Sequence, residues 1–209
     1  MQTRLPTEER QADIVAAALR LAQDSSPALI TTGDIATAVG LTQGAVFKHF
    51  ATKDAIWVAA MRWVRQALLQ VLAEAAATSP TDGAGARSAG GPHAALSAMF
   101  LAHVEFVVAH PGVPRLIFHE LQQPADSATK QEVRGLMQAY RALLLRVLGQ
   151  AVAQGQADPE LDTAAAATLF MGTVQGLVMQ SMLAGKPVAM RSQAPGALAL
   201  VLRGLGGAA

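Results

Sequence analysis

The polar side chains of residues 31–53 are the ones in this chain whose types and spacing could do specific chemistry. Gln43, Lys48 and His49 lie within two helical turns and carry hydrogen-bonding and cationic groups. Groups of this kind bind phosphate oxygens and the edges of bases. Asp34 is the only acidic residue of the segment, so little in it would repel phosphate. The segment is therefore a candidate for contact with nucleic acid.

Two short helices joined by a tight turn would position these side chains. Thr32 can cap the first helix, because its hydroxyl can accept an otherwise unpaired backbone N–H. Gly40 suits the left-handed conformation in which helices often end. Thr42 can then cap a second helix over residues 43–50. This layout is that of a helix-turn-helix, which places its second helix in the major groove of DNA.

The second helix has two kinds of side. Its apolar residues are Val46, Phe47 and Phe50, and we expect all three to be buried. Gly44 and Ala45 are small, so that the backbone there could come close to a DNA edge.

The same stretch resembles the N-terminal signature of TetR/AcrR-family transcriptional regulators, over roughly residues 8 to 60. The positions that agree in type and spacing are Arg10, Ile14, Ala17, Ala18, Thr32, Ile35, Ala36, Gly40, Leu41, Thr42, Gly44, Phe47, His49, Phe50, Lys53 and Asp54. The resemblance implies an all-α fold with a helix-turn-helix DNA-binding domain at residues 1–53. It also implies a helical regulatory and dimerisation domain at residues 54–209.

The resemblance assigns roles to particular residues. It implies that Thr32 and Thr42 contact phosphate, and that His49 and Lys53 contact the DNA backbone. The base-facing positions would be Gln43, Gly44, Ala45 and Lys48. Phe47 stands where the family usually has Tyr, so a phosphate contact from a hydroxyl is either lost there or replaced by apolar packing.

Composition bounds the remaining possibilities. The chain has 209 residues, of which 52% are hydrophobic and 15% charged, as in a globular protein. It has no cysteine, which excludes disulfides and thiolate metal sites, and its N-terminus has no apolar signal core. We therefore expect a cytoplasmic protein. The net charge is only +1, so tight DNA binding would depend on dimerisation and base contacts.

Helical periodicity continues along the chain and predicts about nine helices. A long helix is expected over residues 54–77, with Trp57 and Trp63 in packing contacts. Residues 78–92 are rich in Gly, Pro, Ser and Ala, which predicts a flexible loop.

Residues 163–185 contain no charged side chain, a pattern that would also fit a membrane helix. Scattered Thr and Gln residues and the lack of aromatic belts favour the centre of a soluble homodimer instead. Gly172 and Gly176 would let a partner helix approach closely. The expected interface also includes one face of a final helix, made of Leu198, Val201, Leu202 and Leu205.

Enzyme chemistry is not indicated. His103 and His110 are two helical turns apart, roughly 10 Å of rise, too far to share a metal ion. No nucleophile elbow, phosphate-binding glycine loop or metal-spaced cluster is present. We expect no catalysis, no cofactor and no metal.

The C-terminal helices could still bind a small molecule. The candidate pocket residues are apolar or aromatic with a few polar members: Met99, Phe100, His103, Phe106, Phe118, Met137, Tyr140, Met171, Gln175 and Met179. The polar members are the better candidates, because buried polar groups need partners. Plain core packing is the alternative for each of them.

These patterns give one hypothesis and one rival. The hypothesis is a ligand-responsive transcriptional repressor that binds a pseudo-palindromic DNA operator as a homodimer. A small apolar or weakly polar effector would release it. The rival is a helical ligand-binding or protein-interaction module on the same fold that does not use DNA, and Phe47 and the low net charge keep it open.

Overall fold

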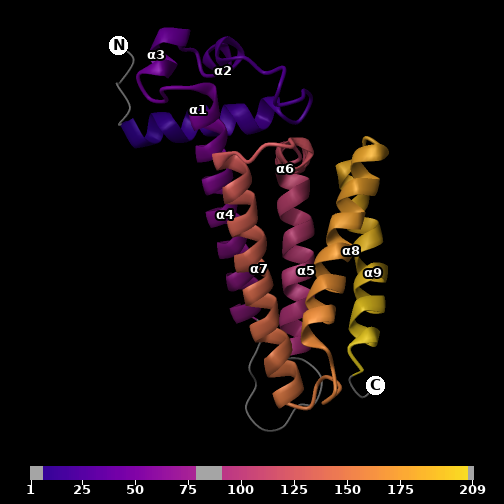
Figure 1. Ribbon diagram of the computed structural model, residues 1–209. Helices are drawn as coiled ribbons and strands as arrows, with labels where there is room; N and C mark the ends of the chain where they lie inside the picture. The colour runs from indigo at the N-terminus through magenta and orange to yellow at the C-terminus, as the bar shows by residue number, and fades with distance from the viewer. Residues whose placement is uncertain (1–6, 79–90, 207–209) are drawn as a thin grey trace. The chain divides into compact units, whose positions relative to one another are not determined.

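The computed structural model describes residues 7–78 and 91–206 of the chain. Within these ranges the chain folds into nine α-helices and one short 3-10 helix, without strands, which confirms the all-α class (Figure 1). The flexible loop predicted at residues 78–92 lies outside the described residues, apart from its two ends.

The described residues form these elements in chain order. Their bounds are α1 Thr7–Leu21, α2 Thr32–Ala38, α3 Gln43–Phe47, α4 Lys53–Thr78, α5 Pro92–Ala109, α6 Gly112–Gln122, α7 Ala128–Ala153, α8 Thr163–Leu183, η1 Pro187–Ala189 and α9 Met190–Gly204.

The helices form two compact units. The first comprises residues 1–66 and 110–135, and the second comprises residues 67–109 and 136–209. Helices α4 and α7 therefore contribute one part to each unit. The division predicted between residues 53 and 54 concerns function rather than packing, and it stays a prediction.

The core of the first unit is built around α1. This helix buries an apolar face that includes Ile14, Ala17 and Ala18, and it packs against α2 and α6. The approach of α6 is unusually close at Gly112, where an added Cβ would lie 2.0 Å from the backbone oxygen of Leu19. Only a residue without a side chain fits there.

The second unit is a helical bundle in which α5 and α8 both pack against α9 (Figure 1). By length and composition α5 and α8 could each cross a membrane. That similarity is weak evidence, because the core helices of soluble bundles pass the same test. Glu105 of α5 forms an ion pair with Arg191 of α9 at 2.7 Å, and the two helices face each other with buried apolar residues.

Candidate nucleic-acid interface

A reciprocal pair of hydrogen bonds fixes the start of α2. The Thr31 hydroxyl accepts from the backbone N–H of Asp34 at 3.1 Å, and the Asp34 carboxylate accepts from the backbone N–H of Thr31 at 2.8 Å. Hydrogen bonds from the Thr31 backbone and hydroxyl hold the pKa of Asp34 below its usual value. The cap predicted at Thr32 is therefore wrong by one residue. Thr32 occupies the first position of the helix and is buried.

The turn between α2 and α3 follows the sequence signal. Gly40 has a φ of +66°, in the left-handed region that favours glycine. The backbone N–H of Leu41 then donates to the carbonyl of Ala36 at 2.9 Å, which closes the end of α2. At the next helix the Thr42 hydroxyl accepts from the backbone N–H of Ala45 at 3.2 Å, so the cap predicted at Thr42 is confirmed.

Helix α3 is shorter than predicted and ends at Phe47. Val46 and Phe50 are buried as expected, because residues four apart share a helix face. Phe47 is 44% exposed, so the prediction that it is buried was wrong. It follows Val46 by one residue, which turns its side chain about 100° away from the core.

The exposed side of α3 gathers most of the predicted DNA contacts. Thr42, Gln43, Gly44, Phe47 and Lys48 are exposed, whereas Ala45 and His49 are half-buried. A Cβ added at Gly44 would meet no described atom within 4 Å, so the backbone there is open to a ligand. The structure thus leaves these residues accessible on α3 and at its two ends, with a single cation and an exposed aromatic ring. We call this set, Thr42 to His49 without Val46, the α3 face.

Lys53 is used differently from the other predicted contacts. Its ammonium donates to the carbonyl oxygens of Ile30 at 3.0 Å, Ala28 at 3.1 Å and Pro27 at 3.4 Å. It therefore ties the start of α4 to the loop between α1 and α2. Nothing in the sequence indicated this tie, since the carbonyls belong to backbone more than twenty residues earlier.

His49 is also anchored by the protein. Its carbonyl oxygen accepts from the Gln11 side-chain amide of α1 at 3.1 Å. Its Nδ1 is buried and has no hydrogen-bond partner within the described ranges. The backbone at the end of α3 is thereby held against α1, a contact that sequence reasoning did not find.

Ionic contacts join α4 and α7 within the first unit. The Glu132 carboxylate of α7 forms ion pairs with two arginines of α4. Its Oε1 lies 2.8 Å from Nε of Arg62, and its Oε2 lies 3.3 Å from Nη1 of Arg65. A Cβ added at Gly135 of α7 would lie 3.0 Å from Nη1 of Arg65. The glycine therefore leaves room for the Arg65 guanidinium.

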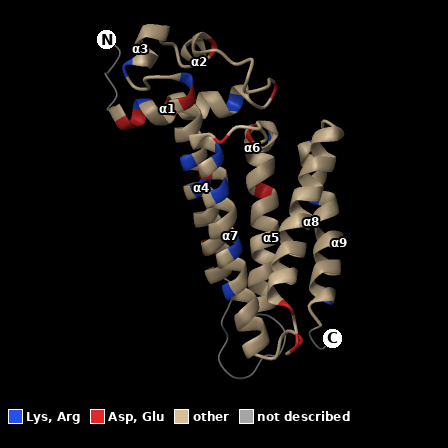
Figure 2. Ribbon diagram, in the orientation of Figure 1, with Lys and Arg blue, Asp and Glu red and all other residues tan. Residues whose placement is uncertain are grey.

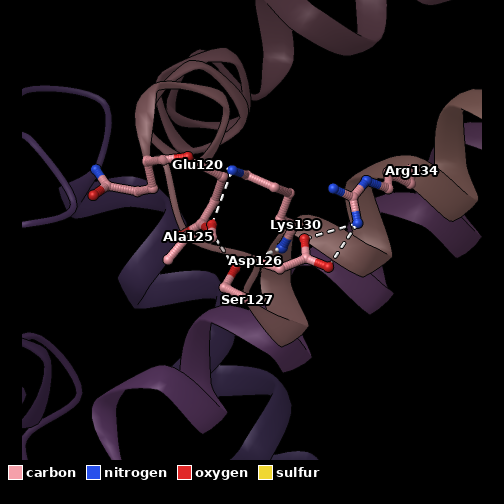
Figure 3. A network of polar contacts seen from close by, with 7 residues as sticks. Glu120, Ala125, Asp126, Ser127, Lys130 and Arg134 are labelled. Carbon is pink, nitrogen blue, oxygen red and sulfur yellow. Dashed lines mark hydrogen bonds and ion pairs between the residues drawn. The ribbon is translucent and has the colours of Figure 1, made fainter.

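A polar network closes the connection between α6 and α7 (Figure 3). The Ser127 hydroxyl donates to the carboxylate of buried Glu120 at 2.7 Å and accepts from the backbone N–H of Lys130 at 2.9 Å. The Lys130 ammonium donates to the carbonyls of Gln123 and of Ala125, the latter at 3.0 Å. Asp126 and Arg134 add an exposed ion pair at 2.7 Å. The network binds backbone that has no regular structure of its own.

In the second unit the structure joins several of the predicted pocket residues in pairs. His103 of α5 and Tyr140 of α7 share a hydrogen bond of 3.1 Å between Nδ1 and the phenol oxygen. The Gln175 amide of α8 donates to the sulfur of Met137 at 3.8 Å. Phe100 packs edge-on against Phe170 of α8, which the sequence reasoning had not included, with ring centroids 5.3 Å apart.

The remaining pocket candidates lie in different environments. Met99 and Phe106 are buried, Met171 is half-buried, and Met179 is 47% exposed. Phe118 lies on α6, in the first unit rather than the second. Among the described residues no three His, Asp or Glu side chains gather as a metal site.

The predicted dimer residues divide into two groups. Leu198, Val201 and Leu205 are buried within the single chain, so they are not free to bind a partner; Leu202 is half-buried. Their amphipathic face packs α9 into its own bundle, which a sequence pattern cannot distinguish from an intersubunit contact. Gly172 and Gly176 of α8, in contrast, have open space beside them, with no described atom within 4 Å of an added Cβ.

Comparison with protein-family models gives two matches along the chain. Residues 14–60 match the model described as bacterial regulatory proteins, tetR family, and residues 119–195 match a tetracyclin repressor-like C-terminal domain. The chain belongs to the TetR family. TetR-family proteins are DNA-binding transcriptional regulators rather than enzymes, and the helix-turn-helix described above lies inside the first match.

Solved structures of other regulators share the fold along nearly the whole chain. The fatty acid degradation regulator FadR from Bacillus halodurans has a TM-score of 0.80 and 17% identity, covering 99% of this chain and 100% of that one. FadR from Bacillus subtilis in complex with stearoyl-CoA has a TM-score of 0.76 and 15% identity, covering 91% of this chain and 97% of that one. The ketosteroid regulator KstR2 of Mycobacterium tuberculosis has a TM-score of 0.74 and 20% identity, covering 95% of this chain and 96% of that one. No curated protein sequence matched the chain.

Proposed function

We propose that this TetR-family protein is a ligand-responsive repressor that binds a pseudo-palindromic operator as a homodimer. The observation that carries the proposal is the α3 face. Thr42 caps the helix, Val46 and Phe50 anchor it, and Gln43 and Lys48 are left exposed without an acidic neighbour on the same helix. A short helix held in this way can present its polar side to the major groove.

The exposed stripe of α8 supports a dimer. Leu169, Met179 and Leu183 are 51%, 47% and 82% exposed, and they recur at helical spacing with Gly172 and Gly176 between them. Helix α8 has no charged residue, and the ribbons of α8 and α9 are almost entirely uncharged in Figure 2. Exposed apolar side chains grouped along one helix favour contact with a partner, and the small residues between them would allow a second copy to pack closely.

The effector part of the proposal rests on the second unit and on the similar structures. One of these is a complex with stearoyl-CoA and another is a ketosteroid regulator. The buried residues of α5 and α8 are mainly apolar, so we infer an effector that is apolar or weakly polar. It would act by binding more tightly to a conformation whose two α3 helices no longer match the operator spacing.

Selection of genomic fragments by purified protein tests the DNA-binding part. We expect recovery of fragments that share a pseudo-palindromic site, with affinity that falls steeply as salt rises. Failure to enrich any site, together with the absence of salt-dependent binding, would favour the rival module that does not use DNA.

Light scattering tests the dimer. Gly172→Arg with Gly176→Arg places two charges in the α8 stripe, and we expect a monomer. Gly149→Arg is the matched control, because Gly149 on α7 also has no described atom within 4 Å of an added Cβ. A dimer that survives the α8 changes would place the interface elsewhere.

A further inference from the structure

We propose that His103 and Tyr140 form one uncharged donor–acceptor site for a single hydroxyl or carbonyl oxygen of an otherwise apolar effector. This inference rests on the proposed function in that it concerns the ligand of the second unit. It adds the chemical class of the polar group that the site accepts and the classes that it rejects.

The two side chains come from different helices and act as a unit. His103 lies on α5 and Tyr140 on α7, with 3.1 Å between Nδ1 and the phenol oxygen and ring centroids 5.3 Å apart. Tyr140 is 1% exposed, so its phenol lies deep in the second unit. His103 keeps part of its surface accessible, and no described residue bonds its Nε2.

Counting protons shows what the pair can still offer. If the phenol donates to Nδ1, the imidazole proton is on Nε2, and the pair has Nε2–H as a free donor and the phenol oxygen as a free acceptor. If Nδ1–H donates to the phenol oxygen, the phenol proton is free and Nε2 is the free acceptor. Either arrangement leaves one donor and one acceptor. A hydroxyl can satisfy both, and a carbonyl oxygen can satisfy the donor.

The pair carries no charge at neutral pH. Burial lowers the pKa of His103 to about 4, which keeps the imidazole neutral. Burial also raises the pKa of the Tyr140 phenol, which keeps it protonated. A carboxylate or an ammonium bound here would therefore face no opposite charge from the pair, and an unpaired charge is costly to bury.

The neighbouring turns of both helices are apolar. Met99, Phe100 and Phe106 lie three or four residues from His103, and all are buried. On α7, Leu136 and Leu144 lie four residues on either side of Tyr140 and are also buried. A ligand that reaches the pair would thus contact hydrocarbon around one polar point.

A set of four probes of equal length tests this specificity on the full chain. The probes are 1-decanol, 2-decanone, decanoate and decylammonium, measured by thermal shift and calorimetry at pH 7.5. We expect the alcohol and the ketone to bind and to raise the melting temperature, while the two charged probes do not. Tyr140→Phe and His103→Phe should each weaken 1-decanol binding about tenfold, the size of one hydrogen bond.

Gln150→Leu is the control variant, because Gln150 is exposed on α7, ten residues beyond Tyr140, and is not one of the candidate pocket residues. It should leave 1-decanol binding unchanged. If a Phe variant does not fold, the ring nitrogen resonances of His103 in the unaltered protein decide, since they should shift on adding 1-decanol.

Three results would overturn the inference: decanoate binding as tightly as 1-decanol, full binding by a folded Tyr140→Phe variant, or no binding of the neutral probes. Operator binding is measured separately by fragment selection. A protein that selects its operator but fails the probe test refutes this inference alone, whereas failed operator selection refutes the proposed function.

Discussion

The two units are stabilised in different ways. In the first unit, side chains bind backbone: Thr31 and Thr42 cap helices, and Lys53 and Lys130 each donate to several loop carbonyls. In the second unit, apolar faces of α5, α8 and α9 pack together, and His103 of α5 bonds Tyr140 of α7. Backbone contacts of the first kind fix geometry, as a DNA-reading helix requires. Side-chain packing of the second kind can adjust to a ligand.

The largest expected effect is at Gly112, where the first unit has no space at all. Gly112→Ala places a Cβ on the Leu19 carbonyl oxygen and should lower the free energy of unfolding by about 3 kcal/mol. Gly149→Ala on α7 is the control. This change should raise the free energy of unfolding by about 0.5 to 1 kcal/mol, because alanine is the better helix former. Urea unfolding of both variants measures the contrast, and equal stability would contradict the close contact.

A change of pH should act on the second unit through His103. The folded state keeps His103 neutral down to a pKa of about 4, whereas the unfolded chain binds a proton near pH 6.5. Stability should therefore fall as pH falls through this window, by about 2 kcal/mol between pH 7 and pH 5.

The variant His103→Phe isolates this contribution in urea unfolding at the two pH values. Burial lowers the pKa of His93 and His110 too, so only the difference between the two proteins is diagnostic. An identical pH dependence with and without His103 would show that its ring is not desolvated.

The two lysines of the DNA-binding segment separate structural from interfacial roles. Lys53→Met removes three hydrogen bonds to carbonyls and should lower the free energy of unfolding by about 1 to 2 kcal/mol. Lys48→Met removes an exposed cation and should change it by less than about 0.5 kcal/mol. Thermal unfolding of the two variants is the measurement. A larger loss of stability in Lys48→Met than in Lys53→Met would contradict these roles.

The smallest expected effect is at the cap of α2. Thr31→Ala should lower the free energy of unfolding by about 1 kcal/mol, because the backbone N–H of Asp34 loses the Thr31 hydroxyl as its acceptor. Thr32→Val keeps the shape of a buried side chain and should cost less. The reverse order would restore Thr32 as the cap.

The sequence predicts the parts of the site that depend on neighbours in the chain. Gly40 and Thr42 mark a turn and a cap by local chemistry, and both are found. Thr31 and Thr32 are adjacent hydroxyl residues, and the choice between them depends on where α2 begins to pack. Phe47 was misplaced because it follows buried Val46 by one residue, which turns its side chain away from the core although it is apolar.

Contacts between distant segments could not be read from the sequence. The carbonyls that bind Lys53 are backbone atoms, which leave no residue signature. His103 and Tyr140 are 37 residues apart in the chain, and their pairing depends on how α5 and α7 are aligned along each other, which the sequence does not show. The face of Leu198 and Val201 was correctly seen as apolar, but periodicity does not say whether its partner is the same chain or a second copy.

The most direct test of the central claim is the salt dependence of operator binding by Lys48→Ala. Fluorescence anisotropy with the selected operator should show a slope of log affinity against log salt that is shallower by about 2 per dimer, because each subunit loses one cation placed against the polyanionic DNA. Lys186→Ala, which removes an exposed lysine outside the α3 face, should leave the slope unchanged. Unchanged affinity and slope in Lys48→Ala would contradict the claim that the α3 face holds DNA.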